Sequence, residues 1–172
     1  IPLKNEEAER EIRSFYSLYT QLGKAKKFYV PPYHEVSLKM KAFQKTSYLL
    51  WALGPSTSSG KKDDPIAVLW LGHFDDVLVY FHPGNTKRGY ELLANYLLVW
   101  EALKLGKKLK LKVFDFETAY DPRYSQENKQ WKGYTEFKQK FGGEFIQYPP
   151  SYIRFYNPIM KYFYLLATVF SK

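Results

Sequence analysis

The sequence has no cysteine among its 172 residues, which excludes disulfides, thiolate metal sites and cysteine nucleophiles. Its three histidines, His34, His73 and His82, do not have the spacing of a metal-binding motif. The serine-centred and glycine-rich motifs of hydrolases, nucleotidases and dehydrogenases are also absent. None of these three enzyme classes is therefore indicated.

Long hydrophobic runs are absent as well. The apolar segment Ile159–Phe170 is interrupted by Lys161 and is shorter than the roughly 20 residues that cross a bilayer. We expect a packed helix there, with attachment to a membrane surface as the alternative. The sequence shows no signal peptide and begins at Ile1 rather than at a methionine, which indicates a trimmed or excised domain.

Aromatic residues and positive charge are abundant. Hydrophobic residues make up 45% of the chain, which is sufficient for the core of one globular domain. Aromatic residues make up 19%, which favours either a ring-rich core or a ring-lined binding groove. The formal net charge of +9 favours nucleic acid, an anionic membrane or a phosphorylated ligand as partner, although a basic surface also improves solubility.

The spacing of apolar residues predicts an α+β fold. Two amphipathic helices come first, the second opened by Pro31-Pro32. Short apolar runs then predict a meander of antiparallel strands at Ser47–Leu53, Ile66–Gly72 and Val77–Phe81.

A third helix should follow the meander, with an inward stripe formed by Leu93, Tyr96, Leu97 and Trp100. The remaining elements are predicted as a strand, a short helix, a strand and a final helix. The two strands are expected at Lys110–Phe116 and Glu144–Tyr148.

Lys138 lies on the aromatic side of the predicted short helix, which ends at Phe141-Gly142-Gly143. At about 100° per residue, Tyr134, Phe137 and Phe141 share one stripe that includes Lys138, whereas Lys140 points elsewhere. An ammonium beside buried rings loses hydration. It is therefore either carried out to water by its long stem or held inward for an anionic or carbonyl partner.

Asp115 and Glu117 are predicted to end a strand in the sequence Asp-Phe-Glu. Alternation then places both carboxylates on one face of the strand and Phe114 and Phe116 on the other. Such a carboxylate can accept a proton from an attacking amine or orient it. Pairing with nearby lysines, or capping of the next segment, is the structural alternative.

Two polar connections carry cations that suit an anionic ligand. In the connection before the predicted short helix, Arg123, Lys129, Trp131 and Lys132 interleave charge with a ring, so that a base can stack while a cation holds phosphate. A solvated loop anchored by Trp131 is equally compatible. In the connection that follows the predicted strand meander, Asn85, Lys87 and Arg88 lead into a helix, where the two cations can contact an anion or simply be solvated.

In chain order these motifs resemble the bacterial Fem family. The matching segments are Tyr96 to Leu103, a Gly-Lys turn, Phe114-Asp115-Phe116, Gly133 to Glu144 and Tyr148-Pro149. The family consists of non-ribosomal peptidyltransferases that use aminoacyl-tRNA to build the cross-bridges of peptidoglycan. The resemblance covers most of the chain beyond Tyr80 and, more loosely, the first two helices. Its most specific part is Phe-Lys-x-x-Phe-Gly-Gly.

The resemblance implies that residues 1–172 are a single GNAT-like acyltransferase domain, with a mixed, mostly antiparallel sheet flanked by helices. It would be the second of the family's twin domains, with the first one missing. The implied reaction moves an amino acid from aminoacyl-tRNA to an amine in the stem peptide of a lipid-linked or UDP-linked muramyl peptide. Neither a metal nor a redox cofactor is implied.

The resemblance also implies roles for individual residues. Lys138 would stabilise the carbonyl oxygen, with Phe137 and Tyr134 beside the substrate. The expected compartment is the cytoplasm, and peripheral contact with the inner face of the membrane stays open.

One part of the GNAT pattern is not present. In acetyl-CoA-dependent members, a loop of the type Arg/Gln-x-x-Gly-x-Gly/Ala binds pyrophosphate through its backbone N–H groups. The segment Gly84–Glu91 stands in that place, and the second small residue is missing. The segment therefore argues against acetyl-CoA binding, and an acyl-CoA-dependent N-acyltransferase is kept as the alternative enzyme because it has the same fold. A non-catalytic cell-wall or RNA-binding module is the alternative outside enzymes.

Overall fold

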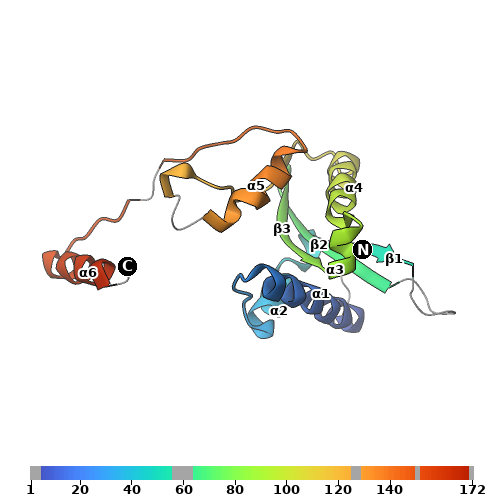
Figure 1. Ribbon diagram of the computed structural model, residues 1–172, viewed down its shortest axis with the longest axis horizontal. Coiled ribbons are helices and arrows are strands. Elements are labelled where there is room, and N and C mark those ends of the chain that lie inside the picture. The colour runs from blue at the N-terminus through green and yellow to red at the C-terminus, as the bar shows by residue number, and fades with distance from the viewer. Residues whose placement is uncertain (1–4, 56–63, 125–128, 150–151, 171–172) are drawn as a thin grey trace. The chain divides into compact units, whose positions relative to one another are not determined.

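The computed structural model describes residues 5–55, 64–124, 129–149 and 152–170. The chain divides into two compact units, Ile1–Thr135 and Glu136–Lys172. The first unit contains a four-stranded mixed sheet with helices on both faces (Figure 1). The predicted α+β class, with a mostly antiparallel sheet, is therefore confirmed.

The first unit contains eight of the helices and strands in the described residues. They are α1 (Asn5–Lys26), α2 (Tyr33–Ala42), β1 (Ser47–Gly54), β2 (Asp64–Phe74), β3 (Val77–Asn85), α3 (Lys87–Glu91), α4 (Ala94–Lys108) and β4 (Val113–Asp115). Helix α5 (Lys132–Gln139) crosses the boundary between the units, and α6 (Pro158–Phe170) belongs to the second. Short 3₁₀ turns occur at Gln44–Thr46, Pro122–Tyr124 and Lys129–Trp131.

The strands follow one another in the sheet in the order β1-β2-β3-β4. The first three form the predicted antiparallel meander, and each is longer than its apolar run. Strand β4 joins β3 in parallel, but only over three residue pairs, from Val77↔Val113 to Val79↔Asp115. This short parallel ladder positions the candidate site described below.

Helices α1 and α2 cover one face of the sheet with a core rich in aromatic rings. Trp70 on β2 is fully buried, and the ring of Phe15 meets it edge-on at 5.9 Å between centroids. The Trp70 indole N–H donates to the hydroxyl of Ser47 at 3.2 Å, so burial leaves that donor satisfied. Much of the aromatic content therefore serves packing.

Helix α4 covers the opposite face of the sheet (Figure 1). The side of α4 that is buried is not the predicted one. The predicted inward residues Leu93, Leu97 and Trp100 are 55–62% exposed. The buried residues are instead Ala94, Leu98, Val99, Ala102 and Gly106.

The reason for this rotation is local. Leu93 adopts a left-handed conformation with φ 55°, which separates α3 from α4 and resets the helical phase. Small residues then let α4 approach the sheet closely: a Cβ at Gly106 would already lie 3.3 Å from the Leu78 side chain.

Two predicted strands also differ in the structure. The strand expected at Lys110–Phe116 is only Val113–Asp115, because Lys110 and Glu117 on either side have positive φ angles of 60° and 59°. Glu144–Tyr148 is not a strand. Its residues are exposed and are not part of the sheet, and they follow two glycines at positive φ.

His82 on β3 is a pH-sensitive side chain next to the aromatic core that α1 forms with the sheet. Its ring stacks on Tyr19 with centroids 5.1 Å apart. Burial, and then the charge of Lys39, lowers the pKa of His82 from 6.5 to about 4. Folding therefore favours the neutral imidazole.

We expect the free energy of unfolding to decrease by about 2 kcal/mol between about pH 7 and about pH 5. The sign follows because the unfolded chain binds a proton at His82 below its pKa of about 6.5, whereas the folded protein does so only near pH 4. Urea denaturation at both pH values measures the change. His82→Phe should flatten the dependence, and His34→Gln, at an exposed side chain, should leave it unchanged. Equal slopes for all three proteins would contradict the assignment.

Candidate active site

The candidate site lies where β3 and β4 diverge. The two strands pair only as far as Val79 and Asp115. Strand β3 then continues to Asn85, whereas the chain after Asp115 turns away through the left-handed conformation of Glu117. The side chains at this divergence come from β3, from the segment after β4 and from the start of α5.

The two predicted carboxylates are placed differently by this turn. Asp115 ends β4, but Glu117 lies beyond it, so the prediction that both share one face of a strand is wrong. Alternation fails because the ladder with β3 stops at Asp115. The Glu117 N–H instead donates to Oδ1 of Asp115 at 2.6 Å. Asp115 therefore already serves as a cap for the following segment, which was the structural alternative.

Tyr80 and Tyr134 face each other at the divergence. Tyr80 on β3 is 1% exposed, its ring lies 6.2 Å from that of Tyr134, and the two hydroxyls are hydrogen-bonded. Phe116 also contacts Tyr80, at 5.9 Å between centroids. Burial raises the pKa of both tyrosines; for Tyr134 the hydrogen bond with Tyr80 opposes this rise, and the negative charge of Glu117 adds to it. Glu117 and Tyr134 are therefore electrostatically coupled.

A part-buried hydrogen bond connects the segment that carries Glu117 with the helix that carries Tyr134. The hydroxyl of Thr135, which is 8% exposed, accepts the backbone N–H of Tyr120 at 2.6 Å. The segment after β4 is thus tied to the start of α5. Neither Thr135 nor Tyr80 was identified from the sequence, because a threonine on a helix and a tyrosine within an apolar strand carry no motif.

Lys138 is buried, with only 6% of its surface exposed, whereas Lys140 is exposed. This difference confirms the helical geometry predicted from the sequence. Among the residues whose side chains the structure describes, Lys138 is the only buried lysine. Lysine is seldom buried to this extent unless its ammonium has a partner, so the inward-held alternative is favoured over a solvated ammonium.

The residues around Lys138 also follow the prediction. The rings of Phe137 and Phe141 meet edge-on at 5.3 Å. Helix α5 ends at Gln139, and the φ angles of Gly142 and Gly143, 78° and 100°, are those that favour glycine after a helix.

Asn85 lies at the end of β3, where the chain enters α3. Its side chain is 4% exposed, and its Oδ1 has no hydrogen-bond partner among the described atoms. A Cβ at Gly89 would lie 2.2 Å from this oxygen and 2.2 Å from the Ile66 carbonyl, so only glycine fits there. Thr86 caps the helix by accepting the Gly89 N–H at 3.0 Å.

The two cations of this connection are on its surface. Lys87 is 92% exposed and lies 3.9 Å from Glu91, one turn further along α3. Arg88 is partly exposed. Because α3 has only five residues, the connection has the geometry of a tight polar link, which was one of the two interpretations.

The loop before α5 is described on both sides of residues 125–128. Arg123 binds Asp121 through two nitrogens at 2.6–3.0 Å, which lowers the pKa of that carboxyl. Trp131 is 38% exposed, and Lys132 is exposed at the start of α5. Arg123 and Lys132 lie on different elements from Lys87 and Arg88. Arg123 pairs with Asp121, and Lys87 lies near Glu91.

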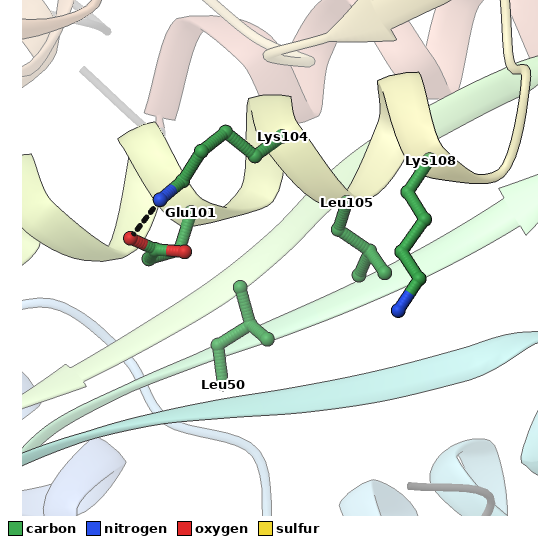
Figure 2. Close-up of a pocket in the computed structure, with 5 residues that line it drawn as sticks. All are labelled: Leu50, Glu101, Lys104, Leu105 and Lys108. Carbon is green, nitrogen blue, oxygen red and sulfur yellow. Dashed lines mark ion pairs between the residues drawn. The ribbon is translucent and has the colours of Figure 1, made fainter.

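An open groove of about 330 Å³ lies on the first unit between α4 and β1. Figure 2 shows Leu50 and Leu105 in it, with the ion pair of Glu101 and Lys104 at one end and Lys108 at the other. The ion pair measures 2.5 Å. None of the predicted site residues lines this groove. It is therefore not part of the candidate active site.

The comparisons do not assign the chain to a known family: no family model matches it, and no curated protein sequence matches it significantly. In the described ranges, no group of three or more histidine, aspartate and glutamate side chains is placed to hold a metal ion. No helix in those ranges is both long enough and apolar enough to cross a membrane.

Proposed function

We propose that this protein is an aminoacyltransferase of GNAT-like fold that transfers an amino acid from aminoacyl-tRNA to an amine of a peptidoglycan precursor's stem peptide. The observation that carries the proposal is the burial of Lys138, one helical turn from Tyr134 on α5. Tyr134 in turn is coupled to Glu117. A cation, a hydroxyl and a carboxylate are the groups that such a transfer can use.

The proposed step is aminolysis of an ester. The amine nitrogen attacks the ester carbonyl, a C–N bond forms, and the C–O bond to the tRNA ribose breaks. The proton that the amine loses ends on the ribose oxygen. Because this reaction is downhill, the protein has mainly to position two substrates and to stabilise the negative carbonyl oxygen. The ammonium of Lys138 would supply that stabilisation.

Of the two carboxylates, Glu117 is the better candidate to orient the amine or relay its proton. Asp115 already accepts the Glu117 N–H at 2.6 Å, whereas the charge of Glu117 acts on the Tyr134 hydroxyl. We assign Asp115 the role of holding the turn that presents Glu117.

The tRNA is proposed to contact the cations Lys87, Arg88, Arg123 and Lys132, with Trp131 stacking on a base of its acceptor end. Phe137 and Asn85 would contact the substrates. The chain would be the second of two GNAT-like domains and would act in the cytoplasm on a lipid-linked or nucleotide-linked muramyl peptide. No metal or redox cofactor takes part in the proposed step.

Neutralising Lys87, Arg88, Arg123 and Lys132 together should weaken tRNA binding and flatten its dependence on salt. Each phosphate contact contributes roughly 0.7–0.9 to the slope of log K against log salt, so the slope should fall by about 3 if all four cations contact phosphate. Filter binding across a salt series measures it. Neutralising Lys24, Lys26, Lys107 and Lys108, which are also exposed, is the control with equal charge change. Identical slopes for the two variants would remove the first set from the site.

The proposed activity is tested by supplying two donors. Charged tRNA and an acyl-CoA are each incubated with a muramyl-pentapeptide and a protein that contains both GNAT-like domains, and amide formation is followed by mass spectrometry. Turnover is expected with charged tRNA. Turnover with acyl-CoA alone would establish the alternative enzyme, and turnover with neither would favour a binding module.

A further inference from the structure

The segment from Tyr152 to the end of α6 has an unusual combination of residues. From Phe145 onward the sequence has no acidic residue, whereas it has three cations, Arg154, Lys161 and Lys172. Tyrosines and phenylalanines are interspersed throughout. Tyr152 and Tyr156 are 84% and 86% exposed, and Arg154 lies over the ring of Tyr156 at 4.9 Å.

Helix α6 has two different sides. Ile159, Phe163 and Leu166, at positions i, i+4 and i+7, share one side and are 63%, 62% and 38% exposed. Lys161, Tyr164 and Thr168 share the opposite side. The ring of Phe155, in the segment before the helix, packs on Tyr164 of the polar side, with centroids 5.1 Å apart.

The start of α6 is set by local residues and does not depend on what covers its apolar side. Oδ1 of Asn157 accepts the Ile159 N–H at 2.8 Å, and Pro158 occupies the first turn, where proline is favoured. The helix is therefore encoded locally, yet its apolar side requires cover, because adjoining large apolar side chains are rarely left in water.

The length and the charge of α6 indicate what covers it. Thirteen residues extend about 20 Å, short of the roughly 30 Å of a bilayer core, so α6 can lie on a membrane but cannot cross it. Tyrosines and phenylalanines beside lysine and arginine are typical of helices at the lipid interface. The absence of acidic residues beyond Glu144 makes the segment complementary to anionic headgroups.

We infer that α6 is an interfacial helix that binds an anionic membrane surface. Ile159, Phe163 and Leu166 enter the boundary between headgroups and acyl chains. Arg154 and Lys161 bind lipid phosphates, the latter by extending its long stem from the polar side. This inference stands on the second unit alone and does not depend on the proposed transferase activity.

Flotation of the whole protein with lipid vesicles tests the inference. Vesicles of phosphatidylcholine alone are compared with vesicles that also contain phosphatidylglycerol. We expect binding to the anionic vesicles only, and a decrease of about tenfold or more in the Phe163→Asp, Leu166→Asp double variant. The milder variant Lys161→Glu, which keeps the apolar side, should lose at least about fivefold.

The matched control is the double variant Leu93→Asp, Leu97→Asp, which places the same two charges on the exposed side of α4. It should bind the anionic vesicles as the unaltered protein does. Equal loss in both double variants, or equal binding to neutral vesicles, would indicate general adsorption and overturn the inference. Absence of binding would overturn it as well. If the α6 variant instead lowered the melting temperature, or converted a dimer into a monomer, α6 would be covered by protein.

Discussion

Replacement of Lys138 by methionine should lower the rate of amino acid transfer about 10²-fold or more. Methionine keeps an unbranched apolar stem of similar length in the buried position, but it removes the ammonium that would stabilise the carbonyl oxygen. The loss should appear in kcat as well as in kcat/KM, because the negative oxygen develops only in the transition state. Steady-state kinetics with charged tRNA measure both constants.

Lys140→Met is the matched control for this substitution. Lys140 lies just beyond α5, two residues from Lys138, and is exposed, so its variant should transfer amino acids at nearly the unaltered rate. A thermal melt of both variants separates chemistry from folding. Undiminished turnover in Lys138→Met, or equal losses in the two variants, would indicate that Lys138 has a structural role and no catalytic one.

The second large effect concerns stability. Trp70→Ala should lower the free energy of unfolding by about 3–5 kcal/mol, because it leaves a large cavity between α1, α2 and the sheet and removes the partner of the Ser47 hydroxyl. Urea denaturation followed by circular dichroism measures the change.

Trp100→Ala provides the comparison, since it deletes the same side chain from a position that is 58% exposed on α4. Its effect should stay within about 0.5 kcal/mol. The pair also tests the orientation of α4, because Trp100 belongs to the stripe that periodicity placed inward. A Trp100→Ala loss as large as that of Trp70→Ala would favour the orientation predicted from the sequence.

The parts of the fold that the sequence predicts well are those fixed by local patterns. Proline at the entrance of α2 and the alternating or continuous apolar runs of β1 to β3 are sufficient to place these elements. The stripe of α4 was mispredicted because α4 is apolar on more than one side, so periodicity alone does not choose between them. The choice depends on the left-handed Leu93 and on the small residues that fit against β2 and β3.

The candidate site also combines features that local sequence patterns predict with features that they do not. The position of Lys138 on the aromatic side of α5 follows from helical spacing against Tyr134 and could be predicted, whereas that spacing left open whether the lysine is solvated or buried. The arrangement of Asp115 and Glu117 could not, because the point at which β4 ends depends on how far its ladder with β3 extends. The Tyr80–Tyr134 hydrogen bond joins residues 54 positions apart in the chain, and no local pattern encodes such a pairing.

The ladder between β3 and β4 has only three residue pairs, and this brevity affects how the molecule responds to heat. Backbone segments with so few hydrogen bonds open at a free energy well below that of global unfolding. Strand β4 also carries the chain that presents Glu117, and beyond it the bond between Tyr120 and Thr135 connects that chain to α5. We therefore expect mild heating to detach β4, and with it the segment that carries Glu117, from β3 and Tyr80 while the core around Trp70 stays folded, so that the candidate site has a lower temperature limit than the domain that supports it.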